Sequence, residues 1–156
     1  MNAARLNLVE HPGSGPYALL VHGFLGSRSY WVDNVDALAA VCRPVVVELW
    51  GHGRSPSPAD PAAYHPGAYM EQFEHIRRQL GAEQLVTIGQ SMGAALTLRY
   101  GLTHPDRVRA QIITNTTSAL AGSTRWLEQH RNTATPFAAR LRREGYQIVH
   151  RTTSSL

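Results

Sequence analysis

The sequence predicts an α/β protein in which a parallel sheet is flanked by helices. Short apolar runs rich in β-branched residues alternate along the chain with segments of helical spacing. The connections between these segments are short, as in proteins built from repeated strand-helix-strand units. Glycine-rich loops follow several of the apolar runs. Right-handed crossovers bring such loops to one edge of a parallel sheet, which is where ligands bind.

Apolar runs bounded by glycine and proline define the predicted strands. The first, over residues 5–10, alternates apolar and polar side chains as an edge strand does. The second, over residues 17–21, is nearly all apolar and is expected to be buried on both faces. The other predicted strands cover residues 44–49, 85–88 and 108–114. A sheet of about five strands is therefore expected.

Apolar residues at helical spacing define three predicted helices. A helix over about residues 30–41 has an apolar face made of Trp31, Val35, Leu38 and Val41. A second helix, over residues 69–80, is expected to end with Gly81 as its C-cap. A third covers residues 94–103, and the proline-rich residues 56–66 are predicted to form a surface loop.

The pattern changes after residue 122, where two short helices are predicted, around residues 126–130 and over 135–145. We therefore divide the chain into a core, residues 1–122, and a basic helical segment, residues 123–156. All fifteen basic residues are Arg, and the net charge of +4 belongs entirely to the second segment. No nucleic-acid motif or interleaved aromatic residue accompanies this charge, so we expect a solvated helix face and no nucleic-acid partner.

Composition bounds the class of protein. An apolar fraction of 43% and a charged fraction of 17% in 156 residues fit one globular core. The single cysteine, Cys42, excludes an internal disulfide framework and is expected to be a buried thiol. We find neither a secretory leader pattern nor an apolar run of about 20 residues. The prediction is a cytoplasmic protein without a membrane partner.

The stretch Gly89-Gln90-Ser91-Met92-Gly93 lies between a predicted strand and a predicted helix and reads G-x-S-x-G. Glycine lacks a Cβ, so Gly89 and Gly93 allow a sharp turn and a close approach of strand and helix. Ser91 is expected at the tip of this turn, with its hydroxyl lifted out of the sheet. The amide of Met92, at the helix start, would point toward an oxygen bound beside that hydroxyl.

The loops after the predicted strands, His22–Ser27, Gly51–Ser55, Ser91 and Asn115, should converge on one crevice. Over about residues 5–122 the chain resembles the α/β-hydrolase superfamily. The resemblance rests on His22-Gly23 with Phe24, on the Gly51–Ser55 turn and on the motif around Ser91, in the family's order and spacing. It implies that Ser91 is the nucleophile and that the backbone amides of Met92 and Phe24 form the oxyanion hole. The basic segment after residue 122 looks like the start of the family's helical lid.

The sequence departs from the family pattern in two ways. Glu48 stands where relatives commonly have Asp, which we expect to affect loop geometry only. The family's catalytic acid and His come from strands after the lid, and we find neither in this chain, so we predict a truncated α/β-hydrolase fold. Some relatives carry the acid after the strand that follows the serine helix, but that position is Asn115. The histidines after Ser91 lie in no recognisable motif; they are His104, His130 and His150.

The resemblance implies a hydrolase that cleaves small or medium carboxylic esters through a Ser91 acyl-enzyme, impaired in this short chain. Alternatives within the superfamily are C–C bond hydrolases, menaquinone-pathway lyases and cofactor-free haloperoxidases. A different class is an inactive fragment or non-catalytic binding module. For it, the strand ending at Thr114 would be an exposed edge that invites self-association.

The resemblance implies a hydrolase that needs no cofactor. We also predict no metal, because the dispersed histidines, such as His65 and His75, lack metal-ligand spacing. His22 and His52 are interpreted as structural loop residues rather than as the general base. Asn115 begins a match to the glycosylation pattern, which we attribute to chance because no secretory signal accompanies it.

Overall fold

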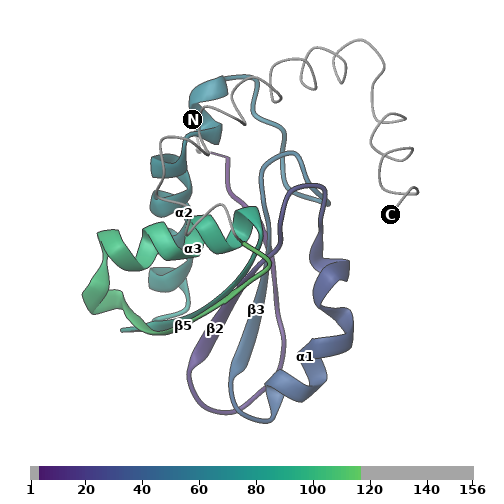
Figure 1. The fold of residues 1–156 in the computed structure, drawn as a ribbon, viewed down its shortest axis with the longest axis vertical. Coiled ribbons are helices and arrows are strands. Elements are labelled where there is room, and N and C mark those ends of the chain that lie inside the picture. Colours follow the sequence, from purple (N-terminus) through teal and green to yellow (C-terminus); the bar gives the residue numbers. More distant parts are fainter. Residues whose placement is uncertain (1–3, 117–156) are drawn as a thin grey trace. The chain divides into compact units, whose positions relative to one another are not determined.

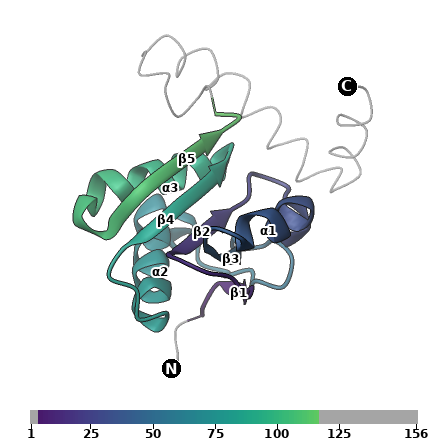
Figure 2. The ribbon, with the colours of Figure 1, turned by 90° about the horizontal axis from the view of Figure 1, so that it is seen from below.

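The computed structural model describes residues 4–116, which all lie in the first of two compact units, residues 1–120 (Figure 1). The predicted boundary after residue 122 and the lid-like segment 123–156 lie outside the described residues. Within the described part, the predicted α/β architecture is confirmed: a five-stranded sheet has helices on both of its faces (Figure 2).

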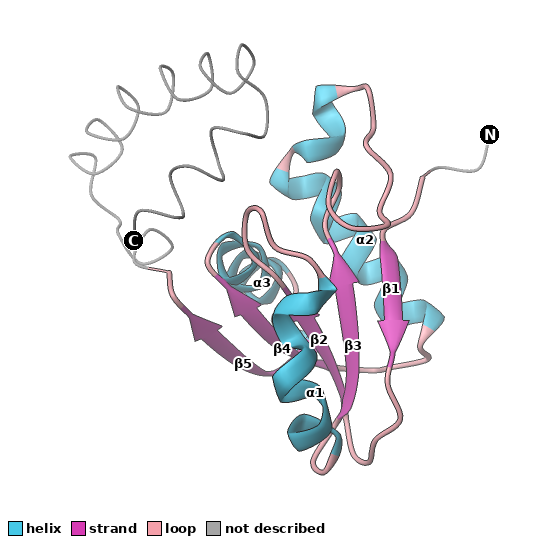
Figure 3. Cartoon of the chain, turned by 90° about the vertical axis from the view of Figure 1, so that its right-hand side faces the viewer, coloured by secondary structure: helices cyan, strands magenta, loops and turns pink. Residues whose placement is uncertain are grey.

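The strands lie in the order β1-β3-β2-β4-β5. Their bounds are Asn7–Glu10 for β1, Tyr17–Val21 for β2, Arg43–Glu48 for β3, Leu85–Gln90 for β4 and Val108–Thr114 for β5. Strands β2 to β5 are mutually parallel, as predicted, but β1 is antiparallel to β3 (Figure 3). The short connection over residues 11–16 turns back at one end of the sheet and cannot return along its length, so β1 and β2 run in opposite directions.

Helix α1 (Val32–Ala39) covers one face of the sheet, and α2 (Pro66–Gln79) and α3 (Met92–Thr103) cover the other (Figure 2). A 3₁₀ turn, η1 (Arg28–Trp31), precedes α1. Val41, predicted on the buried face of this helix, is 70% exposed because α1 ends before it, and Cys42 is buried instead. The predicted surface loop before α2 contains a second 3₁₀ turn, η2 (Pro61–Tyr64), and a third, η3 (Pro105–Arg107), precedes β5.

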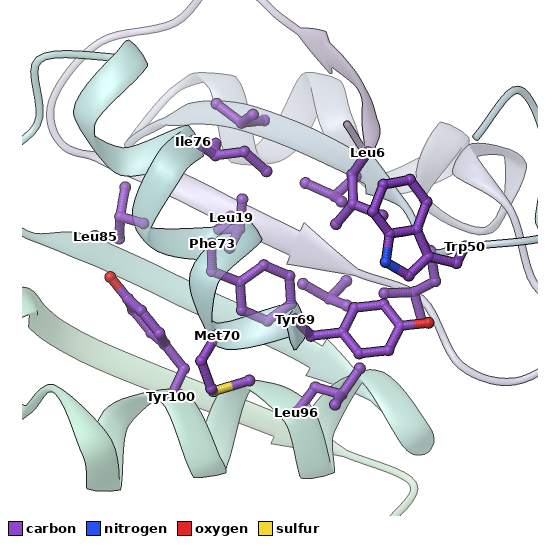
Figure 4. Packing of buried hydrophobic residues seen from close by; sticks show 14 residues of the cluster. Leu6, Leu19, Trp50, Tyr69, Met70, Phe73, Ile76, Leu85, Leu96 and Tyr100 are labelled. Atoms are coloured by element: carbon purple, nitrogen blue, oxygen red, sulfur yellow. The ribbon is translucent and has the colours of Figure 1, made fainter. Parts of the chain in front are cut away.

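Strands β2 and β3 bury apolar side chains on both faces, as predicted for residues 17–21, so the sheet lies between two cores. Leu19, Val21, Val45 and Val47 point toward α2 and α3, whereas Ala18, Leu20 and Val46 pack with residues of α1. In the larger core the ring of Phe73 meets that of Tyr100 edge to face at 5.9 Å (Figure 4). This core holds α3 against α2, and α3 is the helix that begins at Ser91.

A half-buried ion pair within α2 forms a polar tie to α3. Arg77 donates to both oxygens of the Glu74 carboxylate, at 2.8 and 3.0 Å, and the Tyr100 hydroxyl donates to the same carboxylate at 2.5 Å. Arg77 also donates to the carbonyl of Ala82 at 2.6 Å, beyond the end of α2. Gly81 there has φ +63°, which fits the predicted C-cap.

Candidate active site

Ser91 lies, as predicted, at a sharp turn between β4 and α3. Its φ of 51° and ψ of −116° are unfavourable for a residue with a Cβ. Two glycines permit the turn, because a Cβ at Gly89 would lie 2.5 Å from Cα of Ala94, and one at Gly93 would meet the carbonyls of Val21 and His22. The helix start therefore approaches the ends of both β4 and β2.

The backbone of Ser91 is held by hydrogen bonds, whereas its hydroxyl has none within residues 4–116. Its amide donates to the carbonyl of Thr114 at 2.9 Å, and its carbonyl accepts from the amide of Ala95 at 3.2 Å. The side chain is partly exposed, and its hydroxyl has no hydrogen-bond partner within residues 4–116. The strained backbone thus presents an unpaired hydroxyl at the edge of the sheet where the strands end.

Two backbone amides beside Ser91 are also unpaired. Met92 is the first residue of α3, and Phe24 lies in the loop after β2; neither amide donates to another described residue. Gly23 places this loop against the serine, since a Cβ there would lie 2.9 Å from Cβ of Ser91. The structure therefore brings the three predicted site residues, Ser91, Phe24 and Met92, to one place, and their catalytic roles remain predictions.

His22 is a structural residue of this loop. It is fully buried, its Nε2 accepts from the amide of Leu49 at 3.1 Å, and its Nδ1–H then donates to the carbonyl of Gly23 at 2.7 Å. Burial lowers the pKa of His22, which favours the neutral ring that these two bonds require. Because both ring nitrogens are engaged, His22 does not serve as the base for Ser91.

His52 joins the turn after β3 to the loop after β2. Its Nε2 accepts from the amide of Leu25 at 3.2 Å, and Nδ1–H donates to the carbonyl of Trp50 at 2.8 Å. Its ring also meets Phe24 edge to face, with centroids 6.1 Å apart. Leu25 has φ +64°, so this bond holds a residue in the left-handed region next to Phe24.

Glu48 also joins the loop after β2 to the turn after β3. Its side chain is 1% exposed and accepts from the amide of Arg54 at 2.9 Å, the amide of Arg28 at 3.3 Å and the side chain of Asn7 at 2.9 Å. Burial acts to raise the pKa of this carboxyl, but these donors and the Arg28 charge together bring it below its usual value. A Cβ at Gly53, where φ is +54°, would collide with the carboxylate. The sequence alone did not predict these contacts of Glu48. Gly53 was the available signal, since a glycine in a turn can mark a position where another group approaches the backbone closely.

An apolar groove of about 580 Å³ begins beside the Phe24 loop and follows α3. Phe24 and Met92 line it near the serine, Trp50 and Tyr69 line it on the other side, and Arg99 is its charged residue. Phe24 and Met92, the residues that carry the two amides, thus also line the groove. This arrangement suits an apolar group attached to a carbonyl centre.

Asn115, the position compared above with the acid of some relatives, directly follows β5. Asn115 has φ +51° and lines a second groove, of about 450 Å³, together with Trp31 of η1. His104 lies at the far end of α3, where its ring is 5.2 Å from that of Tyr100, so it is not beside Ser91. His130 and His150 fall outside the described residues. Asn115 therefore supplies no carboxylate at the end of β5, and none of His22, His52 and His104 is placed to act on the serine.

Within residues 4–116, no group of three or more His, Cys, Asp or Glu side chains is arranged to hold a metal ion. In the same part of the chain, no helix has the length and apolar character needed to cross a membrane. The predictions of no metal, no cofactor and a cytoplasmic location stay predictions.

Comparisons with known proteins agree with this geometry. The family model described as alpha/beta hydrolase fold matches residues 19–148. Bifunctional epoxide hydrolase 2 of Rattus norvegicus is 37% identical over 113 residues, covering 72% of this chain and 20% of that protein. The (Lyso)-N-acylphosphatidylethanolamine lipase of Homo sapiens is 33% identical over 99 residues, covering 61% of this chain and 28% of that protein.

Solved structures give the same result. An epoxide hydrolase from an endophytic Streptomyces matches with a TM-score of 0.65 and 32% identity, over 71% of this chain and 36% of that one. A marine microorganism esterase has a TM-score of 0.65 at 24% identity, over 71% of this chain and 41% of that one, which is a likeness of fold. The chain thus spans well under half the length of each of these relatives.

Proposed function

The chain belongs to the α/β-hydrolase fold family, and from that premise we propose that its site is the nucleophile half of a serine hydrolase for carboxylic esters. The observation that carries the proposal is the left-handed backbone of Ser91, whose hydroxyl, like the nearby amides of Phe24 and Met92, has no partner among the described residues. Strain of this kind is retained where the surrounding structure enforces it, and it is concentrated at functional sites.

In the proposed reaction the Ser91 oxygen attacks the ester carbonyl carbon, and the carbonyl oxygen becomes an oxyanion that accepts from the two amides. Collapse of this tetrahedral species breaks the C–O bond, releases the alcohol and leaves an acyl group on Ser91. Water then attacks the acyl-enzyme and releases the acid. A base must take the hydroxyl proton, and we place its source outside residues 4–116, since both ring nitrogens of His22 and of His52 are engaged.

The nucleophile itself favours acyl substrates over epoxides, although epoxide hydrolases are among the relatives. A serine alkoxide that opened an epoxide would form an ether, which water does not cleave under mild conditions. The same alkoxide attacking an ester forms another ester, which water can hydrolyse with general-base help. The groove beside Met92 and Phe24 suits an acyl or alcohol group that is small or medium-sized and apolar.

Fluorophosphonate labelling tests the nucleophile. We expect the 156-residue chain to label slowly over hours, since general-base help is worth about 10²–10⁴-fold, with the adduct mapped to Ser91 by mass spectrometry. Ser91→Ala should abolish the adduct. Ser14→Ala is the matched control, because the Ser14 hydroxyl donates to the carbonyl of Ala40, away from the site. An adduct that persists in Ser91→Ala contradicts the proposal.

The ester preference needs a chain that also contains the base. In such a longer chain we expect p-nitrophenyl esters of graded acyl length to be hydrolysed, with an optimum at short to medium chains. Cleavage of a β-diketone without ester turnover would instead place the protein among C–C bond hydrolases.

A non-catalytic binding role is the second candidate, and the exposed edge of the sheet supports it. Strand β5 pairs only with β4 among the described strands, and Ile112 on it is 47% exposed. Such an edge can pair with a second copy of the chain. Light scattering over a range of concentrations tests this role: a concentration-dependent dimer supports it, and a monomer throughout rejects it.

A further inference from the structure

His52 lies between the loop after β2 and the turn after β3, and the proposed reaction assigns it no role. Its Nδ1–H bonds within its own turn, to the carbonyl of Trp50, while its Nε2 reaches across to the amide of Leu25. The two residues are far apart in sequence, so the bond fixes the loop after β2 to the turn after β3. Leu25 follows directly on Phe24, whose amide is one of the two proposed oxyanion donors.

We propose that His52 is a positioning residue that sets the direction of the Phe24 amide by holding Leu25 in its left-handed conformation; this inference rests on the proposed function. His52 accepts from the N–H of Leu25, which belongs to the peptide unit between Phe24 and Leu25. This unit is adjacent to the one that carries the Phe24 N–H, so the bond limits rotation about ψ of Phe24 and φ of Leu25. The ring of His52 also contacts the ring of Phe24 from the side. Backbone and side chain of Phe24 are thus held by one residue.

Other contacts of the loop do not replace this bond. Glu48 holds the loop farther along, at the amide of Arg28, and His22 holds it before Phe24, at the carbonyl of Gly23. The amide of Gly26 donates to the carbonyl of Gly23 at 3.1 Å, which closes a tight turn around Phe24 and Leu25. Within that turn the Leu25 amide is bonded to a side chain from outside the loop, and that side chain is His52.

Two substitutions separate the bond to Leu25 from the bond to Trp50. The amide of Gln extends to the position of Nε2, so His52→Gln retains an acceptor for Leu25 and loses the donor to Trp50. The amide of Asn is located near Nδ1, so His52→Asn retains the donor to Trp50 and loses the acceptor for Leu25. A residue that only stabilises its own turn would tolerate Asn better than Gln, and a residue that positions the Phe24 loop would show the opposite order.

The first measurement is hydrogen exchange of the Leu25 amide by NMR, which needs no activity. Losing a hydrogen bond of about 1 kcal/mol corresponds to an exchange rate about five- to tenfold faster. We expect this increase in His52→Asn, and a rate within about twofold of the parent chain in His52→Gln. Equal exchange in the two variants, or faster exchange in Gln than in Asn, overturns the assignment of the bond whatever Ser91 does.

The second measurement is the rate of fluorophosphonate labelling, which depends on the oxyanion donors. We expect a loss of about tenfold in His52→Asn and about threefold or less in His52→Gln, since deleting a donor outright costs about 10²–10³-fold. Equal labelling of Asn and parent chains, with faster Leu25 exchange in Asn, shows that the bond exists but does not position the amide, and this rejects the proposal. Absence of any label on Ser91 in the parent chain is instead a failure of the proposed function, and the exchange result still decides the bond.

Discussion

The loops after β2, β3 and β4 and the end of β5 lie at the same edge of one sheet, yet they differ in how completely they are bonded. Three buried or half-buried side chains, His22, Glu48 and His52, tie the loop after β2 to the turn after β3. The loop after β4 is held by the bond from the amide of Ser91 to the carbonyl of Thr114. At the end of β5, Asn115 lines an open groove, and the indole nitrogen of Trp31, which lines the same groove, is buried without a partner in residues 4–116. The proposed nucleophile and oxyanion donors are thus positioned by contacts within these residues, whereas we place the source of the acid and base outside them.

The largest effect is expected at Gly93, where helix and strand ends meet. Ala normally favours a helix over Gly by about 1 kcal/mol. In Gly93→Ala, however, the new Cβ would collide with the backbone carbonyls of Val21 and His22, which cannot move aside as a side chain can. We expect a loss of about 3 kcal/mol in the free energy of unfolding, measured by urea titration.

Gly101→Ala is the matched control for this prediction. It lies in the same helix, but its Cβ would meet only the far end of the Gln111 side chain, which can turn away at the cost of its bonds to Thr87 and Thr97. We expect a change within about 1 kcal/mol. If both variants are equally stable, the close approach of α3 to β2 is not a constraint on the site.

The second effect is expected at Glu48, which accepts from three N–H groups on three segments. Glu48→Gln replaces one acceptor oxygen by a donor that faces other donors, so we expect a loss of about 2–3 kcal/mol in urea unfolding at neutral pH. Glu10→Gln, at an exposed position, should change stability by less than about 0.5 kcal/mol. Equal stability of the two variants would contradict a loop-holding role for Glu48.

Strands could be predicted from the sequence where local signals delimit them. The bounds of β2 and β5 match the predicted residues 17–21 and 108–114. An apolar run marks β2, and β-branched residues between a proline turn and Asn115 mark β5. The sharp turn at Ser91 was predictable for a similar reason. Two glycines at fixed spacing around Ser91 specify a turn in which larger residues would collide with the backbone.

Features set by distant contacts could not be predicted in this way. Helical spacing continues through Val41, but the chain turns after Ala39 to enter β3, so Val41 is exposed. The antiparallel direction of β1 depends on which strand it pairs with, and spacing does not report pairing. The bonds from His52 to Leu25 and from Glu48 to Arg28 join residues that are far apart in sequence. No local sequence pattern indicates that a side chain of one loop bonds to the backbone of another.

The third effect concerns the stability of the fold at acid pH, through the Glu74 carboxylate between α2 and α3. The bonds from Arg77, opposed by burial and aided by the Tyr100 hydroxyl, lower the pKa of Glu74 from 4.5 to about 2. Because this pKa is lower in the folded state, Glu74 stabilises the fold fully at pH values above its pKa in the unfolded chain. The contribution is lost as pH falls from 4.5 toward 2. We expect Tyr100→Phe to cost about 1 kcal/mol at neutral pH and to flatten stability against pH in this window. An unchanged acid limb in the variant would count against this tie.

The smallest effect is expected on the other side of the comparison, at Trp31. Its indole Nε1 is buried and has no hydrogen-bond partner in residues 4–116, so Trp31→Phe removes an unpaired donor at the same time as it removes packing. These two effects oppose each other, and we expect a change within about 1 kcal/mol by urea unfolding. Trp50→Phe is the matched substitution beside the bonded loops; its larger loss, about 1–2 kcal/mol, follows from packing alone. A loss at Trp31 that equals or exceeds the loss at Trp50 would show that the indole N–H has a partner outside residues 4–116, and that the end of β5 is completed by residues other than those described.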